Sequence, residues 1–150
     1  MVAAPGSVGK RLDVPGGDQD FIWQPTDVFG NADKLGAHVV VCGGGSIGMD
    51  VALYLASSGH RVTVLTRQKN VGFGADSYDK SDLVAERKLE NPAIIREAQV
   101  TEIFANAVVY TDREGTAHNI SFDSIVVSAG RMPLLEECER FAVSGLEFYV

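Results

Sequence analysis

The spacing of apolar residues predicts a βαβ unit near the centre of the chain. Residues 38–42 form a nearly continuous apolar run, which is typical of a parallel strand buried on both faces. Ile47, Val51 and Leu55 then recur every four residues, so they predict one helix face that lies against a sheet. A second β-branched run follows at residues 61–66 and completes the predicted unit.

The pattern after this unit changes from helical spacing to short strands. Residues 93–96 predict a third strand of the parallel sheet. Three short runs at 100–104, 107–111 and 117–122 are separated by turn-forming residues, as in an antiparallel meander. Residues 124–130 predict a buried strand that ends in a glycine turn. The predicted fold class is therefore α/β, a Rossmann-like parallel sheet with a three-stranded antiparallel meander crossover.

The segments outside these elements are rich in turn-forming residues. Residues 1–37 contain several prolines and glycines without a sustained period, so we interpret them as a connecting arm. Within it, Pro15-Gly16 favours a type II turn, and residues 26–34 predict a short helix capped by Thr26 or Asp27. Residues 68–80 predict a loop near the glycine turn, and residues 81–90 predict a helix capped by Ser81.

Composition narrows the classes of function. The chain has 150 residues, 45% of them hydrophobic and 22% charged, which predicts a globular protein with a buried core. Its net charge of −7 argues against nucleic acid or an anionic membrane as a partner, because no general basic field exists. No run approaches the ~20 apolar residues of a membrane span, and no secretory leader is evident. We expect a cytoplasmic protein.

Cysteine and histidine spacing offers no catalytic or metal-binding motif. Cys42 and Cys138 lie far apart in the sequence and match neither a redox motif nor a metal-ligand cluster. We therefore expect both to be reduced thiols, and we expect Cys42 to have a packing role. The three histidines are isolated in the sequence, and we expect each of them to lie on the surface: His38, His60 and His118. We predict no catalytic residue and no metal ligand.

Three glycines follow the first strand with the spacing of a dinucleotide-binding turn. Gly43, Gly45 and Gly48 match GxGxxG, in which the first glycine permits the tight turn, the second admits a pyrophosphate and the third lets the helix approach the strand. The phosphates would then contact the amides of Ser46 and Ile47 at the positive end of the helix dipole. An ordinary glycine turn of an α/β fold is the alternative.

The order of these elements resembles a known family. Residues 122–133, Phe-Asp-Ser-Ile-Val-Val-Ser-Ala-Gly-Arg-Met-Pro, resemble the second signature of the NAD(P)-binding domain of FAD-dependent pyridine nucleotide-disulphide oxidoreductases. Residues 14–16, 27–29 and 34–36 precede the glycine strand as Val-Pro-Gly, Asp-Val-Phe and Lys-Leu-Gly. These segments are most similar to the group of 2,4-dienoyl-CoA reductase, enoate reductase and trimethylamine dehydrogenase.

The resemblance implies a domain inserted between two halves of an FAD domain. Residues 1–37 would be the connecting arm to a missing FAD domain, 38–133 the NAD(P)-binding domain, and 134–150 a return segment. We therefore expect a fragment of a flavoprotein oxidoreductase that binds a nicotinamide dinucleotide and presents it to a flavin domain of the parent chain. A non-catalytic domain that holds an adenine nucleotide for structural reasons is the alternative function.

Four further residues bear on the choice of cofactor. The resemblance places Asp50 near the nicotinamide ribose, where relatives often carry Glu, although a helix-surface Asp without a ligand is the alternative. Thr66 stands where an NAD enzyme has an acid for the ribose 2′-hydroxyl, and Arg67 and Lys69 follow it. An arginine grips phosphate bidentately, so this set predicts NADP(H) over NAD(H), unless the two cations are merely solvated.

The last strand of the sheet predicts the other end of the site. Ligands of open α/β sheets lie at the carboxyl ends of the strands, so Ala129 and Gly130 should lie beside the nicotinamide. The chain has no Tyr-x-x-x-Lys pair, which argues against a reductase of the short-chain dehydrogenase kind. Within the chain no flavin motif or redox dithiol is evident, so we expect the isolated chain to bind the nucleotide without turning it over.

Overall fold

The computed structural model describes residues 6–72 and 91–134. The predicted helix at 81–90, most of the predicted loop at 68–80, Cys138 and nearly all of the predicted return segment at 134–150 lie outside the described residues. Within the part that is described, no helix is long and apolar enough to cross a membrane.

A five-stranded parallel sheet forms the centre of the fold. Its order is β2-β9-β3-β4-β5, and every neighbouring pair is parallel. The strands, in chain order, are β2 (Ile22–Trp23), β3 (His38–Cys42), β4 (Arg61–Leu65), β5 (Ala93–Ile95) and β9 (Ser124–Val127). The predicted parallel sheet and its third strand are therefore confirmed, and β3 lies in the middle with β4 on one side and β9 on the other.

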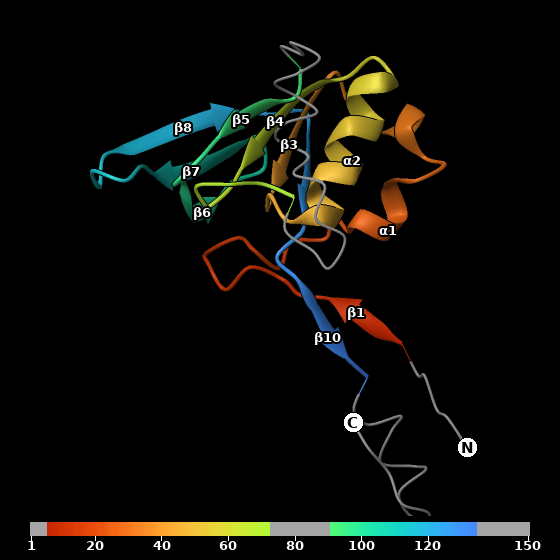
Figure 1. Ribbon diagram of the computed structural model, residues 1–150, viewed down its shortest axis with the longest axis horizontal. Helices are drawn as coiled ribbons and strands as arrows, with labels where there is room; N and C mark the ends of the chain where they lie inside the picture. Colours follow the sequence, from red (N-terminus) through yellow and green to blue (C-terminus); the bar gives the residue numbers. More distant parts are fainter. Residues whose placement is uncertain (1–5, 73–90, 135–150) are drawn as a thin grey trace, which may run out of the picture.

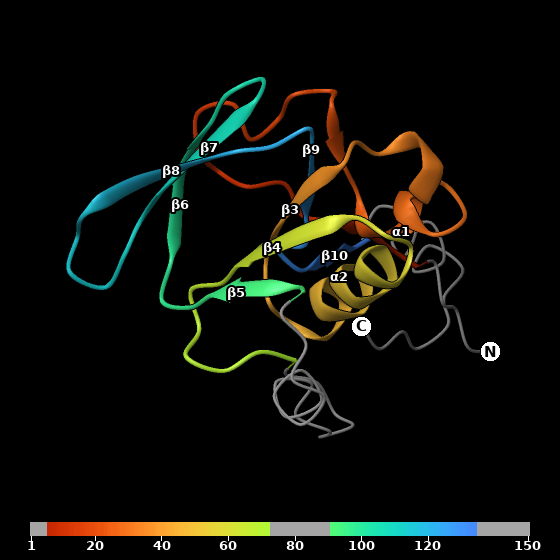
Figure 2. The same ribbon diagram turned by 90° about the horizontal axis from the view of Figure 1, so that it is seen from above.

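Helices cover one face of this sheet (Figures 1 and 2). They are α1 (Pro25–Val28), a 3₁₀ turn η1 (Ala32–Lys34) and α2 (Ser46–Ser57). Alternate residues of β3 point to opposite faces, as in any strand, and Val39 and Val41 pack with Val51 and Leu55 of α2 in one buried cluster. This cluster fixes α2, and hence the turn that precedes it, against the middle of the sheet.

A three-stranded antiparallel meander covers the other face (Figure 2). It consists of β6 (Gln99–Ile103), β7 (Ala107–Thr111) and β8 (Ala117–Ser121), paired in the order β6-β7-β8. Val40 and Cys42, the other alternate residues of β3, pack in a second cluster with Val108 of the meander. The predicted meander is confirmed, and the sheet is buried on both sides, which explains the unbroken apolar run of β3.

The segment predicted as a connecting arm contains two strands. β1 (Ser7–Gly9) pairs antiparallel with β10 (Arg131–Pro133), and this ribbon projects from the body of the molecule (Figure 1). β2 adds an edge to the central sheet beside β9. Between them the predicted type II turn is present, since Gly16 has φ 77° and the N–H of Gly17 donates to Val14 O at 2.9 Å.

Two predictions about the helices are wrong. Residues 26–34 do not form one helix, because Gly30 adopts φ 79° between α1 and η1. The N-cap position of α1 is Gln24, not Thr26 or Asp27, and Pro25 begins the helix. Ile47 does not join the buried face of α2 and is 40% exposed. A helix turns by 3.6 residues, so the buried stripe runs through Met49 and Ala52 instead of keeping a strict four-residue spacing.

The histidines are less isolated than the sequence suggests. The ring of His38 hydrogen-bonds Thr63 Oγ1 at 3.0 Å, and His60 Nδ1 lies 2.8 Å from Gly36 O; both side chains are half-buried, so the surface assignment is wrong for these two. Burial, with a smaller contribution from a nearby arginine, lowers the pKa of His38 below its ordinary value. His118 is exposed and pairs with Asp112 at 2.7 Å.

Candidate nucleotide-binding site

The turn between β3 and α2 requires glycine at its first and last motif positions. Gly43 has φ 123°, and a Cβ built there would lie 2.1 Å from Ser128 O. A Cβ on Gly48 would lie 1.9 Å from Gly43 O. Both distances are far below van der Waals contact, so these glycines let the turn fold tightly beside β9 and let α2 pack directly on it.

The two middle glycines of the turn differ from each other. A Cβ on Gly44 would lie 2.7 Å from Thr66 Cβ, so this glycine permits the turn to pass the end of β4. A Cβ on Gly45 would meet no atom within 4 Å, and its φ of −69° is open to any residue. Neither the backbone conformation nor the packing of the chain therefore requires glycine at position 45, and the absence of a side chain leaves open space at the start of α2.

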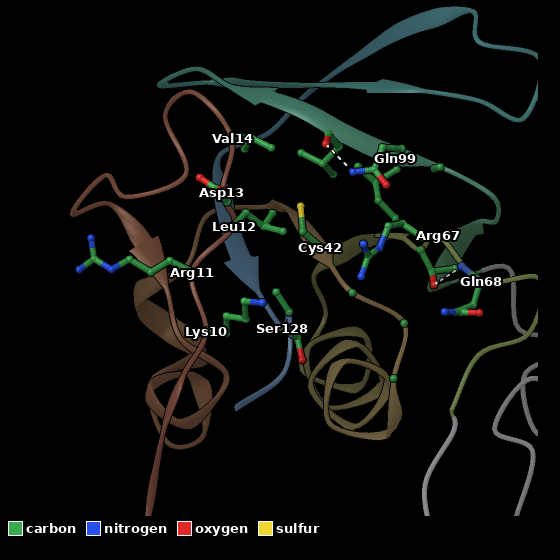
Figure 3. A pocket seen from close by; sticks show the side chains of 18 residues that line it. Lys10, Arg11, Leu12, Asp13, Val14, Cys42, Arg67, Gln68, Gln99 and Ser128 are labelled. Atoms are coloured by element: carbon green, nitrogen blue, oxygen red, sulfur yellow. Dashed lines mark hydrogen bonds between the residues drawn. The ribbon is translucent and has the colours of Figure 1, made fainter. Parts of the chain in front are cut away.

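A cavity of about 560 Å³ opens beside this turn, at the carboxyl edge of the sheet (Figure 3). Its volume falls in the range typical of small-molecule sites. The walls come from five places: the turn, the end of β4, the end of β9, the start of β6, and the arm before the Pro-Gly turn. The lining residues are Lys10, Arg11, Leu12, Asp13, Val14, Cys42, Gly43, Gly44, Gly45, Leu65, Thr66, Arg67, Gln68, Ala98, Gln99, Val100, Ser128 and Ala129.

Five of the predicted site residues line this cavity together, although they come from three separate segments: Gly43, Gly45, Thr66, Arg67 and Ala129. The parallel pairing of β3 with both β4 and β9 produces this meeting, because parallel strands end at the same edge. The arrangement thus joins the glycine turn to the residues that follow its two neighbouring strands.

The other predicted residues lie around the cavity without lining it. Ser46 and Ile47 begin α2 just beyond Gly45, and Gly48 is buried beneath the turn. Asp50 is exposed one turn further along the helix.

Lys69 is exposed on the segment that follows β4, and it does not line the cavity. Gly130 also lies outside the lining; it has φ 102° and accepts the backbone N–H of Lys10 at 2.9 Å.

The end of β4 presents one buried and one exposed predicted residue. The Thr66 side chain is 3% exposed and its hydroxyl accepts the backbone N–H of Gln68 at 3.2 Å, so it shapes the loop after β4. Arg67 is exposed, and its guanidinium points into the cavity toward the glycine turn (Figure 3). Of the two, Arg67 has the geometry to reach an anion.

Sequence reasoning missed an entire wall of the cavity. Residues 10–14 line it through backbone placement that no local motif signals. Gln68 and Gln99, which have amide side chains, also line the cavity, and Ser128 adds a hydroxyl after β9. The adjacent cations Lys10 and Arg11 were the available signal, because they stand out in a chain of net charge −7.

Cys42 also lines the cavity, but its chemistry is that of a packing residue. It is 3% exposed, and burial raises the pKa of its thiol to about 12. The thiolate is the nucleophilic form, so at neutral pH Cys42 stays protonated and unreactive. This agrees with the predicted packing role.

The residues present fit a phosphorylated ligand. Gly45 leaves open space at the amino end of a 12-residue helix, where the helix dipole favours negative charge. Lys10 and Arg67 place cationic groups in the cavity from its two sides (Figure 3). A nicotinamide dinucleotide, if bound, would be held by this turn and these cations.

Comparison with known proteins identifies relatives along nearly the whole chain. The pyridine nucleotide-disulphide oxidoreductase family matches residues 1–148. Dihydrolipoyl dehydrogenase of Mycoplasma pneumoniae is 34% identical over 141 residues, which are 91% of this chain and 30% of that protein. The chain spans between 22% and 43% of the length of the first four curated relatives that it matches.

Two further relatives are reductases by name. The structure of 2-naphthoyl-CoA reductase in complex with 2-naphthoyl-CoA has a TM-score of 0.72 and 26% identity, over 84% of this chain and 19% of that one. Cinnamate reductase of Clostridium sporogenes is 30% identical over 71 residues, which are 47% of this chain and 10% of that protein. The fold of the described residues is thus similar to a part of the 2-naphthoyl-CoA reductase structure, and the matched part is 19% of that chain.

Proposed function

Because the chain belongs to the pyridine nucleotide-disulphide oxidoreductase family, a family of flavin-dependent oxidoreductases, we propose that it is the NAD(P)H-binding domain of such an enzyme. The cavity beside the glycine turn holds the dinucleotide. The nicotinamide is presented at the Ala129 end to a flavin held by another domain. The chain's own contribution is to bind and orient the dinucleotide, and the hydride transfer belongs to the cofactors.

One observation carries this proposal: of the four glycines between residues 43 and 48, three need to be glycine for packing and one does not. Gly43, Gly44 and Gly48 would each clash with a neighbour if they carried a Cβ, whereas Gly45 faces open space beside the cavity. A glycine that packing does not require is explained by a ligand that must approach its α-carbon. The pyrophosphate of a dinucleotide is such a ligand.

A preference for NADP(H) over NAD(H) follows from the end of β4. The position that would hold an acid for the ribose 2′-hydroxyl is Thr66, whose buried hydroxyl is engaged with Gln68. Arg67 extends from the next position into the cavity, where its fork of N–H groups suits a 2′-phosphate. Lys69, outside the lining, contributes less.

The relatives bear on which enzyme group the chain comes from. Two of them, 2-naphthoyl-CoA reductase and cinnamate reductase, are named for substrates that are an acyl-CoA and an unsaturated acid. They favour the group that includes 2,4-dienoyl-CoA reductase and enoate reductase, and we propose that this chain belongs with them. In that arrangement, residues 1–37 and 134–150 connect residues 38–133 to the flavin domain.

Calorimetric titration of the 150-residue chain with NADPH, NADH and ADP tests the proposal. We expect saturable binding of NADPH, weaker binding of NADH, and still weaker binding of ADP. A chain that retains ADP and gives no response to NADPH would instead be a non-catalytic adenine-nucleotide domain.

A second experiment tests the division of labour with the flavin domain. The chain is mixed with NADPH and free FAD or FMN, and absorbance of the reduced nicotinamide is followed over time. Because hydride transfer needs an acceptor held about 3–3.5 Å from the donor carbon, we expect no oxidation above the rate of the cofactors alone. Rapid oxidation that disappears in Gly45→Val would show that the chain holds a complete active site.

A further inference from the structure

We propose that Lys10, on the arm before the Pro-Gly turn, is an anion-binding residue for the nicotinamide half of the dinucleotide. The inference rests on the proposed function of the cavity, and it assigns a role to the wall formed by residues 10–14, which the sequence did not predict. It has three parts: the arm is fixed in place, Lys10 points into the cavity, and it does so on the side opposite Arg67.

The arm that carries Lys10 is held to the body at both of its ends. At one end the backbone N–H of Lys10 donates to Gly130 O at 2.9 Å. At the other end the N–H of Ile103 donates to Pro15 O at 2.9 Å, and a Cβ on Gly16 would lie 1.9 Å from Ile103 O. The backbone of the arm is therefore pinned against both β10 and β6.

Apolar contacts hold the middle of the arm. Leu12 and Val14 pack against the buried cluster that lies between the sheet and the meander. A side chain that leaves this segment starts from a fixed position, so a cation on it costs less entropy to order than one on a free loop. The fixed backbone of the arm thus makes its side chains suited to binding a ligand in the cavity.

The two cations of the arm point in different directions. The Lys10 side chain lines the cavity and points in the direction of Ser128, which lines it too (Figure 3). Arg11 points away from it (Figure 3), and its guanidinium donates to Asp18 O at 2.6 Å, closing the loop that contains the Pro-Gly turn. Lys10 is therefore the ligand-facing cation of the pair, and Arg11 is structural.

The strand order decides which part of the ligand Lys10 meets. β9 and β4 flank β3 on opposite sides, so Ser128 and Arg67 lie on opposite sides of the glycine turn. A dinucleotide that crosses such a turn puts one nucleoside on each side, with the pyrophosphate between them. Since Arg67 serves the adenosine ribose, Lys10 serves the half beyond the pyrophosphate.

The chemistry of Lys10 fits that half. An ammonium group is a compact charge with three donors, so it can bind a phosphate oxygen and the ribose hydroxyls that follow it. This half is identical in NADPH and NADH. Lys10 should consequently raise the affinity for both cofactors equally, whereas Arg67 distinguishes between them.

The test measures the binding of three ligands to the parent 150-residue chain and to three variants by calorimetry. Lys10→Met keeps the length of the side chain and removes its charge, and Lys10→Arg restores a charge. Lys34→Met is the matched control, because Lys34 is exposed on η1 and bonded to Asn31 Oδ1. The ligands are NADPH, NADH and adenosine 2′,5′-bisphosphate, which lacks the nicotinamide half.

We expect Lys10→Met to lower the affinity for both NADPH and NADH by about 10-fold and to leave the affinity for the bisphosphate unchanged. Lys10→Arg should recover most of the loss, and Lys34→Met should change nothing. The melting temperature of Lys10→Met should equal that of the parent chain. In that variant, an equal loss of affinity for the bisphosphate, or an unchanged affinity for NADPH, overturns the inference. If the parent chain binds none of the three ligands, the proposed function fails and the inference fails with it.

Discussion

Replacing Gly45 with valine separates the nucleotide-binding role of the turn from its structural role. Gly45 is the N-cap of α2 and has extended backbone angles, φ −69° and ψ −178°, which valine adopts without strain. A Cβ there meets no atom of the chain within 4 Å. The substitution therefore adds a branched side chain that begins in open space beside the cavity.

The expected cost to folding is small and the expected cost to binding is large. Valine is a poorer N-cap than glycine, which costs about 1 kcal/mol. A phosphate displaced from the start of α2 loses charge-assisted hydrogen bonds worth about 1.5–3 kcal/mol each. Loss of one such bond lowers affinity for NADPH about 10- to 150-fold.

The assay is a pair of measurements on the same variant. Urea denaturation followed by circular dichroism gives the free energy of unfolding, and calorimetry gives the dissociation constant for NADPH. A Gly45→Val chain that binds NADPH as tightly as the parent would refute the placement of the pyrophosphate at this turn. Unfolding of the variant would refute our inference that packing does not require Gly45.

Three other substitutions test individual contacts. Gly48→Ala should destabilise the fold by about 1–3 kcal/mol in urea denaturation, because its Cβ would lie 1.9 Å from Gly43 O; unchanged stability would mean that the turn relaxes easily. Arg67→Ala should weaken the binding of NADPH about 10- to 100-fold in calorimetry and leave the binding of NADH nearly unchanged, with Lys34→Ala as the control; equal losses for both cofactors would contradict a contact with the 2′-phosphate. The pKa of His38 is lowered in the folded state, so the unfolded chain binds more protons and stability should fall as the pH drops below the ordinary value of 6.5. His38→Gln should flatten that slope in urea denaturation between about pH 7.5 and about pH 5.5, and an unchanged slope would assign it to other groups.

The sequence was sufficient to predict the layers of the fold, because each layer has its own period. The unbroken valine run of β3 requires cover on both faces, and the short alternating runs after residue 98 supply one of the covers. The pattern could not place β2, whose two residues are too few to carry a period and which joins the sheet only by pairing with β9. It also misplaced Ile47, since a spacing of four drifts around a helix of 3.6 residues per turn.

The candidate site divides along similar lines. The glycine turn and Arg67 were predictable because a local motif and the end of a strand mark them. The arm wall with Lys10 was not, since hydrogen bonds to Gly130 and Ile103, far away in sequence, place it. The burial of Thr66 likewise depends on Gly44 and on the loop after β4, and neither contact has a signature in the sequence.

The central claim is that a nicotinamide dinucleotide binds at the carboxyl edge of β3, β4 and β9. The most direct measurement is an amide nitrogen–proton correlation spectrum of the isotopically labelled chain, recorded during titration with NADPH. We predict the largest shifts at residues 43–48 and at Arg67 and Gln68, with smaller shifts at Lys10 and Ala129 and almost none in β7 and β8. Saturable shifts confined to the meander or to the β1–β10 ribbon, with the glycine turn unmoved, would contradict the account.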